Sequence, residues 1–236
     1  MFRYVTEYLQ KEFTTVRTIK KNDDKTLLKV RHIRNGEYYF VRFGKGDPQV
    51  YRRLLNIKSK NVPEIFETAS ENDRFVVIEE YIPGDPLDEL LKDTCFTRQE
   101  TVKTAVDICR ALYTLHKAGI VHRDVKAENV RIRQGTNDAI LLDFDASRTM
   151  KTERERDTVQ LGTAGYAAPE QYGISQTDGR ADIYALGVLM NIMLTGSHPS
   201  EKLAEGRLGR IISRCTMVHP DKRYTDALRL MEALDR

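Results

Sequence analysis

The chain has 236 residues, of which 40% are hydrophobic and 31% are charged. This composition is typical of a soluble globular protein, and it excludes long disordered tails. The 38 Lys and Arg residues nearly balance the 35 Asp and Glu residues, giving a net charge of +3. Since neither sign forms a long run, the charge pattern argues against nucleic acid or an anionic membrane as a partner.

The cysteines and the apolar segments indicate in which compartment of the cell the protein is found. The three cysteines, Cys95, Cys109 and Cys215, are far apart and lack C-x-x-C spacing, so neither a disulfide framework nor a zinc site is indicated. Residues 1–10 have no continuous apolar core of the signal-peptide kind, and the longest apolar stretch, residues 184–194, is too short to cross a bilayer. We therefore expect a cytoplasmic chain without a membrane span of its own.

The first third of the chain is rich in β-branched and aromatic residues. Residues 27–33, the Asn35-Gly36 pair and residues 38–43 predict a strand, a tight turn and a second strand. Residues 49–55 interrupt this pattern with apolar positions at helical spacing. The sequence leaves open whether four residues before this region pack on it or on a partner: Phe2, Val5, Tyr8 and Leu9.

From residue 97 onward the pattern becomes helical. Thr97 and Glu100 predict a capping box, and apolar residues follow at helical spacing until Gly119. Residues 139–142 predict a buried strand, and residues 182–194 and 225–234 predict further helices. The chain is therefore expected to have an α+β fold, with a small β-rich part and a larger helical part.

Three short motifs follow one another in the second half. They are H-R-D-V-K-A-E-N at residues 122–129, D-F-D at 143–145 and A-P-E at 168–170. Together, in this order, they resemble the catalytic loop, metal-binding segment and A-P-E motif of protein kinases. The sequence G-Y-A-A-P-E-Q and the D-F-D variant resemble the corresponding motifs of bacterial, Firmicutes-type members of the eukaryotic-like Ser/Thr protein kinase family.

The resemblance implies a bilobal kinase-like fold, with residues 1–81 as the nucleotide-binding N-lobe and residues 82–236 as the catalytic C-lobe. It also implies ATP and Mg²⁺ as cofactors and a protein substrate. Asp124 would orient the attacking hydroxyl, Lys126 would reach the γ-phosphate, and Asn129 and Asp143 would hold the metal. Such residues suit phosphoryl transfer because that reaction depends on positioning and charge neutralisation.

Further residues acquire expected roles from the same resemblance. Thr163 lies in the segment that faces a Ser or Thr substrate. Thr158 is the favoured phosphorylation site of the activation segment, where Arg123 could pair with a phosphate; an ordinary loop hydroxyl is the equally weighted alternative. Two structural elements are also implied: Asp182 would brace the catalytic loop, and Arg223 would pair with Glu170.

The N-terminal part departs from the family. Arg42 occupies the position of the phosphate-binding lysine, and Gln49 replaces its glutamate partner. The nucleotide contacts implied by alignment are Lys20, Asn22, Lys25, Leu27, Arg42, Glu80, Ile82 and Asn129, the first three of which replace glycines. Without glycines the backbone approaches phosphates less closely, and Asp23 and Asp24 would repel them.

Lys25 could supply the missing lysine, as in with-no-lysine kinases, or it could be a solvated turn residue, which its acidic neighbours favour. Phe40 and Arg131 would narrow the adenine pocket, and Asp145 replaces the glycine of D-F-G. Three functions are thus open: a Ser/Thr protein kinase, a pseudokinase acting as a binding module for a regulatory protein, and a small-molecule kinase. The segment at residues 162–170 argues against the third.

Overall fold

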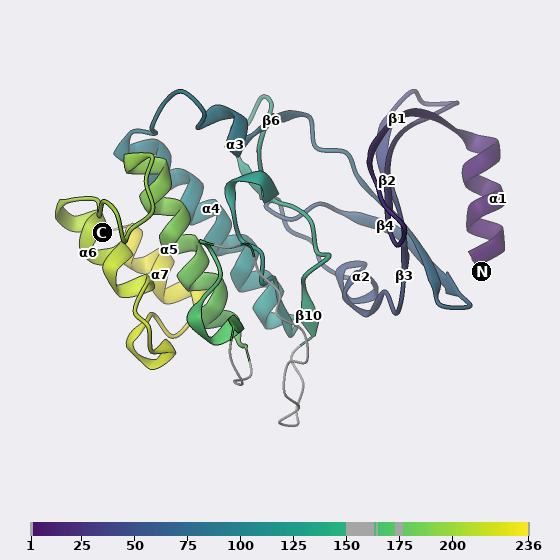
Figure 1. The fold of residues 1–236 in the computed structure, drawn as a ribbon. Helices are drawn as coiled ribbons and strands as arrows, with labels where there is room; N and C mark the ends of the chain where they lie inside the picture. The colour runs from purple at the N-terminus through teal and green to yellow at the C-terminus, as the bar shows by residue number, and fades with distance from the viewer. Residues whose placement is uncertain (1, 150–162, 164, 173–176, 236) are drawn as a thin grey trace. The chain divides into compact units, whose positions relative to one another are not determined.

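The computed structural model describes residues 2–149, 163, 165–172 and 177–235. Thr158 lies outside these residues, so its role stays a prediction. The chain forms two compact units (Figure 1). Unit 1 comprises Met1–Ser59 and Pro63–Ile82, and unit 2 comprises Lys60–Val62 and Pro83–Arg236. The small β-rich part and the larger helical part give the α+β architecture that the sequence predicts.

Unit 1 is built on one antiparallel sheet of five strands in the order β1-β2-β3-β5-β4. Tight hairpins join neighbouring strands: Gly36 has a φ of 74° after β2, and Asn72 and Asp73 have φ of 47° and 62° between β4 and β5. Such positive φ values suit the hairpin turns that keep the twist of the strands. The strands are β1 (Phe13–Lys21), β2 (Thr26–His32), β3 (Tyr38–Lys45), β4 (Ile65–Glu71) and β5 (Arg74–Glu80).

A helix packs on each face of this sheet. Helix α1 (Phe2–Glu12) buries Val5 and Leu9 in a core with Val30, Val41 and Ile78. For Phe2, Val5 and Leu9 this contact answers the question that the sequence left open, because they pack on the sheet of their own unit, whereas Tyr8 is 40% exposed. Helix α2 (Gln49–Leu54) buries Tyr51 and Leu54, and Tyr51 contacts Phe75 and Arg42 on the opposite face of the sheet.

Unit 2 is mainly helical. Its helices are α3 (Leu87–Leu90), α4 (Arg98–Lys117), α5 (Gly179–Thr195), α6 (Gly206–Cys215) and α7 (Ala227–Leu234). Short strands and 3-10 helices connect them: β6 (Gly84–Pro86), β7 (Ile120–Val121), η1 (Ala127–Asn129), β8 (Val130–Arg133), β9 (Ala139–Leu141), β10 (Arg148–Thr149), η2 (Pro169–Tyr172) and η3 (Pro220–Lys222). Among the described residues no helix is both long and apolar enough to span a membrane.

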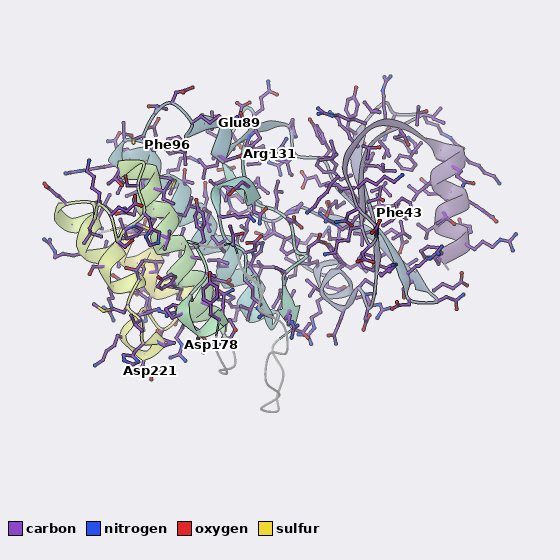
Figure 2. All side chains as sticks on the ribbon, in the orientation of Figure 1. Phe43, Glu89, Phe96, Arg131, Asp178 and Asp221 are labelled. Atoms are coloured by element: carbon purple, nitrogen blue, oxygen red, sulfur yellow. The ribbon has the colours of Figure 1, made fainter. Side chains whose placement is uncertain are left out.

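The ends of the long helices follow from local chemistry. The capping box predicted for α4 is confirmed, since Thr97 Oγ1 accepts from the Glu100 N–H at 3.2 Å and Glu100 Oε2 accepts from the Thr97 N–H at 2.8 Å. Asp178 caps the N-terminus of α5, and Gly196 ends it in the left-handed conformation. Figure 2 labels Asp178 beside Asp221, and Arg180 contacts both carboxylates.

Asp182, in the first turn of α5, ties this helix to the segment after β7. Its fully buried carboxylate accepts from the backbone N–H of Arg123 at 2.7 Å and of His122 at 2.9 Å, and His116 Nε2 lies 2.8 Å from Oδ2. Burial acts to raise the pKa of Asp182, but the His116 contact and the other donors outweigh it, so the pKa lies below its ordinary value. The carboxylate therefore stays ionised in the interior.

A second buried charge pair joins Arg223 to Glu170. The guanidinium binds the carboxylate through two hydrogen bonds of 2.6 and 2.8 Å. Its remaining N–H groups donate to the backbone carbonyls of Met217, Arg180 and Val218 at 2.7 to 3.0 Å. All five donors of the guanidinium are thus used, which is the condition under which a buried charge is tolerated.

The Asp182 network generates a pH-dependent stability prediction. Because the folded pKa lies below the unfolded value of about 3.9, the stabilisation is present above that value and is lost as the pH falls through the folded pKa. Asp182→Asn should destabilise unit 2 by roughly 3–5 kcal/mol at pH 7, since it breaks a buried charged network. The difference from wild type should narrow below about pH 4.

Urea unfolding at a series of pH values measures this difference. The exposed Asp93→Asn change is the matched control, and it should alter the free energy of unfolding by less than about 0.5 kcal/mol. Parallel pH curves for wild type and Asp182→Asn would contradict the assignment.

Candidate catalytic site

Four of the predicted site residues share one hydrogen-bond network in unit 2. Asp124 Oδ1 accepts from Thr163 Oγ1 at 2.7 Å, and Asp124 Oδ2 lies 2.9 Å from both Lys126 Nζ and Asn129 Nδ2. Lys126 Nζ also donates to Thr163 Oγ1 at 2.6 Å. The catalytic loop, the 3-10 helix η1 and Thr163 thus converge on a single carboxylate.

The environment of Asp124 fixes its charge. Burial acts to raise the pKa, but hydrogen bonds from Lys126, Thr163 and Asn129 and the charge of Lys126 outweigh it, so the pKa lies below its ordinary value. The side chains of Asp124 and Lys126 remain 17% and 19% exposed. An ionised carboxylate and an ammonium group are therefore both within reach of a molecule that binds from solvent.

His122 supports this loop from the interior. It is fully buried, and burial lowers its pKa, so the imidazole is neutral. Nε2 lies 3.0 Å from the carbonyl oxygen of Leu142, and Nδ1 accepts from the Asp124 N–H at 3.4 Å. These partners assign the proton to Nε2. His122 thereby links the loop around Asp124 to the segment that begins with Asp143.

The residues expected to hold metal lie on adjoining segments. The Leu142 N–H donates to the Asn129 carbonyl at 2.8 Å, which fixes Asp143 next to the end of η1. Asp143 has a φ of 61°, an uncommon backbone conformation for a residue other than glycine. Asn129 directs its amide nitrogen to Asp124 O and Oδ2, both at 2.9 Å, which leaves the amide oxygen for a cation.

This donor set fits Mg²⁺. A carboxylate and an amide oxygen are ligands of the kind that Mg²⁺ uses, and the ion completes its shell with water and substrate phosphates instead of an all-protein cage. Among the described residues, no group of three or more His, Cys, Asp or Glu side chains is placed to hold a metal ion.

Arg123 and Gln171 support the site from the interior. Arg123 is buried with a φ of 71°, and its carbonyl accepts from Gln171 Nε2 at 3.0 Å. Gln171 Oε1 in turn accepts from the Ala168 N–H at 2.9 Å. The Asp182 and Glu170–Arg223 contacts described above complete this support. Sequence reasoning missed Gln171 and His116, because a glutamine in a loop and a histidine late in a helix carry no distinctive signal.

The hairpin between β1 and β2 takes the place of a glycine-rich loop. Asn22 Oδ1 accepts from the Asp24 N–H at 3.1 Å and the Lys25 N–H at 2.8 Å, so a side chain closes the turn. Lys20 is exposed on β1, and Lys25 is half-buried at the turn. Asp24 pairs with Lys45 at 2.6 Å, and this hydrogen bond lowers its pKa. One of the two carboxylates expected to repel phosphates thus has a cationic partner.

Arg42 is engaged inside unit 1. Its side chain is 5% exposed, and Nη2 lies 3.4 Å from Oε1 of Glu79, which is 8% exposed. The guanidinium carbon lies 5.8 Å from the centre of the Tyr51 ring. Sequence reasoning missed Glu79 as the partner of Arg42, since it looked for a glutamate in the helix that begins at Gln49. A prediction that β3 pairs with β5 could have identified Glu79, because this pairing places Glu79 opposite Phe40, two residues from Arg42.

Strand register places the other expected nucleotide contacts. Leu27 lies opposite Arg42 in the sheet. Phe40 packs edge-on against Tyr81, with ring centres 5.2 Å apart. Glu80 Oε2 accepts from the Glu64 N–H at 3.2 Å, and Ile82 is fully buried.

In unit 2, Arg131 on β8 reaches the Gly84 carbonyl at 3.4 Å (Figure 2). Asp145 follows Asp143 closely, and its N–H lies 3.3 Å from Asp143 Oδ1.

Comparison with known proteins agrees with this geometry. Residues 12–233 match the sequence model of the protein kinase domain. The chain is 28% identical to serine/threonine-protein kinase PknA of Nostoc over 203 residues, which cover 76% of this chain and 36% of the relative. It is 32% identical to serine/threonine-protein kinase PknB of Mycobacterium leprae over 168 residues, which cover 65% of this chain and 27% of the relative.

A third relative, serine/threonine-protein kinase D of Synechocystis, is 27% identical over 207 residues, which cover 76% of this chain and 39% of the relative. The chain thus matches well under half of the length of each of these three relatives. Bacterial relatives are present among the matches, as the motif sequences predict. The prediction of the family is confirmed: this chain belongs to the protein kinase domain family and is related to the eukaryotic-like Ser/Thr protein kinases of bacteria.

Proposed function

We propose that the chain is a Ser/Thr protein kinase that transfers the γ-phosphate of ATP to a protein hydroxyl. The observation that carries the proposal is the network in which Asp124 receives hydrogen bonds from Lys126, Asn129 and Thr163. An ionised carboxylate that remains partly exposed is suited to orient a hydroxyl and accept its proton. Asn129 and Asp143 supply oxygen ligands beside it.

The residues would act in a simple order. Asp124 accepts a hydrogen bond from the substrate hydroxyl, whose oxygen forms a bond to the γ-phosphorus as the bond to the ADP oxygen breaks. The hydroxyl proton passes to Asp124, and Lys126 offers a positive charge to the phosphoryl oxygens. Thr163, which contacts both side chains, positions them. Mg²⁺, when bound by Asn129 and Asp143, would neutralise phosphate charge.

In this proposal residues 1–81 supply the nucleotide contacts and residues 82–236 supply the chemistry. Lys25 is the proposed substitute for the phosphate lysine, because Arg42 is engaged by Glu79. The substrate is a protein carrying Ser or Thr, and the location is the cytoplasm. The whole protein's activity and partners belong to the proposal too, since the chain matches only part of its relatives' length.

A second candidate, a non-catalytic binding module, is favoured by a separate observation. The Arg42–Glu79 pair is buried, and the Phe40 ring packs against Tyr81 on the strand where the family binds adenine. Arg42 would then serve the stability of unit 1 and not phosphate binding. The two candidates differ in whether Mg²⁺-ATP is consumed.

The central test is Asp124→Asn, which keeps the size of the side chain but removes its charge and basicity. Phosphate transfer from Mg²⁺-ATP to the protein itself or to a generic Ser/Thr substrate should fall by roughly 10²–10⁴-fold. Mass spectrometry of the products measures it, and Asp93→Asn, an exposed change in the same unit, should leave transfer unchanged. Equal transfer by wild type and Asp124→Asn would overturn the catalytic assignment; no transfer by either would favour the binding module.

Lys25→Ala tests the relocated lysine. If Lys25 contacts phosphate, its loss should reduce transfer at least tenfold, since a charge-assisted contact is removed. Lys11→Ala, which removes an exposed lysine at the end of α1, is the matched control in the same unit. Equal rates for the two variants would assign Lys25 to the turn alone and leave the kinase proposal standing.

The contribution of the buried Arg42–Glu79 pair to the free energy of unfolding can be measured with single and double variants. Glu79→Leu leaves a buried guanidinium without this carboxylate and should destabilise the fold by roughly 3–5 kcal/mol. The double variant Arg42→Met/Glu79→Leu should recover most of that loss, because an apolar pair replaces an ion pair. Urea unfolding measures both. A tenfold loss of Mg²⁺-ATP affinity in a well-folded double variant would show that Arg42 binds nucleotide after all.

A further inference from the structure

A groove of about 490 Å³ lies on the α1-covered side of unit 1, away from the face that carries Arg42 and Glu79. Helix α1 forms one wall with Tyr4 and Tyr8, and Val5 and Ile78 contribute apolar surface. Its volume falls in the range of small-ligand pockets, roughly 300–1,000 Å³. All its lining residues belong to unit 1.

The walls of this groove are aromatic. Phe13 packs edge-on against Tyr8, His32 and Tyr39, with ring centres 5.7, 4.8 and 5.5 Å apart. Tyr39 packs in the same way against Phe66 at 5.4 Å. In an edge-on pair the edge of one ring points at the face of the other, so the faces open to a ligand are those outside these pairs. Tyr4, Tyr8 and Phe66 are 73%, 40% and 45% exposed, far more than aromatic residues of a closed core.

A β-bulge in β4 brings a carboxylate to these rings. The register between β4 and β5 shifts between Ile65 and Glu67, where Ile65 lies opposite Glu79 and Glu67 lies opposite Ile78. Phe66 is the extra residue, so Phe66 and Glu67 both line the groove although neighbours in a regular strand point to opposite faces. The bulge therefore builds an aromatic ring and a carboxylate into the same wall.

The carboxylate has no cationic partner in the part of the chain that the structure describes. Glu67 Oε1 accepts only the N–H of Thr68 at 3.0 Å. A second carboxylate lies near the rim, where Glu37 accepts from the Tyr39 hydroxyl at 2.8 Å and from Asn35 at 2.8 Å. The groove thus combines π-faces with unneutralised negative charge, two features that attract organic cations.

We propose that this groove binds the arginine side chain of a partner protein. A planar guanidinium can stack on an aromatic face and donate to the free oxygen of Glu67 at the same time, which a compact, strongly hydrated ammonium does less well. The groove is larger than one guanidinium, so the residues that flank the arginine would also find room along α1. This assignment is independent of phosphate transfer, because none of its residues belongs to the catalytic network.

The test uses a peptide pair on the full chain. Acetyl-Gly-Arg-Gly-amide is titrated against the ¹⁵N-labelled protein, and the same peptide with citrulline is the control, because citrulline has a similar shape without the charge. The arginine peptide should produce saturable shifts at the amides of α1 and β4, with a dissociation constant on the order of 1 mM. The citrulline peptide should bind at least about fivefold more weakly.

Variants assign the effect to the groove. Glu67→Gln should weaken the arginine peptide at least about fivefold, whereas Glu71→Gln, an exposed charge at the end of the same strand, should change its affinity less than twofold. Tyr4→Leu should also weaken binding, and because Tyr4 is 73% exposed the substitution should leave the free energy of unfolding unchanged within about 0.5 kcal/mol.

Three results would overturn the proposal. They are equal binding of the two peptides, no saturable shift by roughly 20 mM peptide, or tighter binding of free arginine than of the capped peptide, which would point to a small molecule instead of a protein.

Discussion

The geometry of the candidate site in unit 2 depends on one buried carboxylate. Asp182 accepts two backbone N–H groups from the loop that carries Asp124, and a histidine from α4 approaches it as well. Because these donors belong to the loop and to α4, and Asp182 itself belongs to α5, the carboxylate ties the loop to both long helices. The two N–H groups that it holds belong to the residues directly before Asp124, which itself accepts a hydrogen bond from Thr163, and Arg123 has a positive φ of 71°.

Next to Asp182, the polar and charged side chains of the candidate site form hydrogen bonds and ion pairs with one another. Lys126, Asn129 and Thr163 keep Asp124 ionised although burial acts in the opposite direction. Neutral His122 connects the loop to the segment of Asp143 without adding a charge. Asn129 holds its hydrogen bonds to Asp124, and Asp143 lies on the adjoining segment, so the side chains of the site are positioned by contacts within unit 2.

The sequence predicted the parts of the molecule that local chemistry determines. Strand alternation, the Asn35-Gly36 turn and the Thr97–Glu100 box identify their own elements, and the three kinase motifs identify the family. Contacts between distant segments were harder. Glu79 meets Arg42 only through strand register, Phe66 and Glu67 share a face only through a bulge, and Val5 and Leu9 become core residues only because α1 folds onto its own sheet. None of these follows from spacing along the chain.

The five donors of Arg223 also set how freely that position can vary. Each N–H has its own acceptor, two on Glu170 and three on backbone carbonyls that cannot be mutated away. Lysine would offer three donors from a single point and would leave buried carbonyls without hydrogen bonds. This position therefore strongly favours arginine, whereas the turn at Asn22 closes with a side chain in place of a glycine. Amino-acid substitutions should therefore be tolerated in the hairpins of unit 1 more readily than in the interior of unit 2.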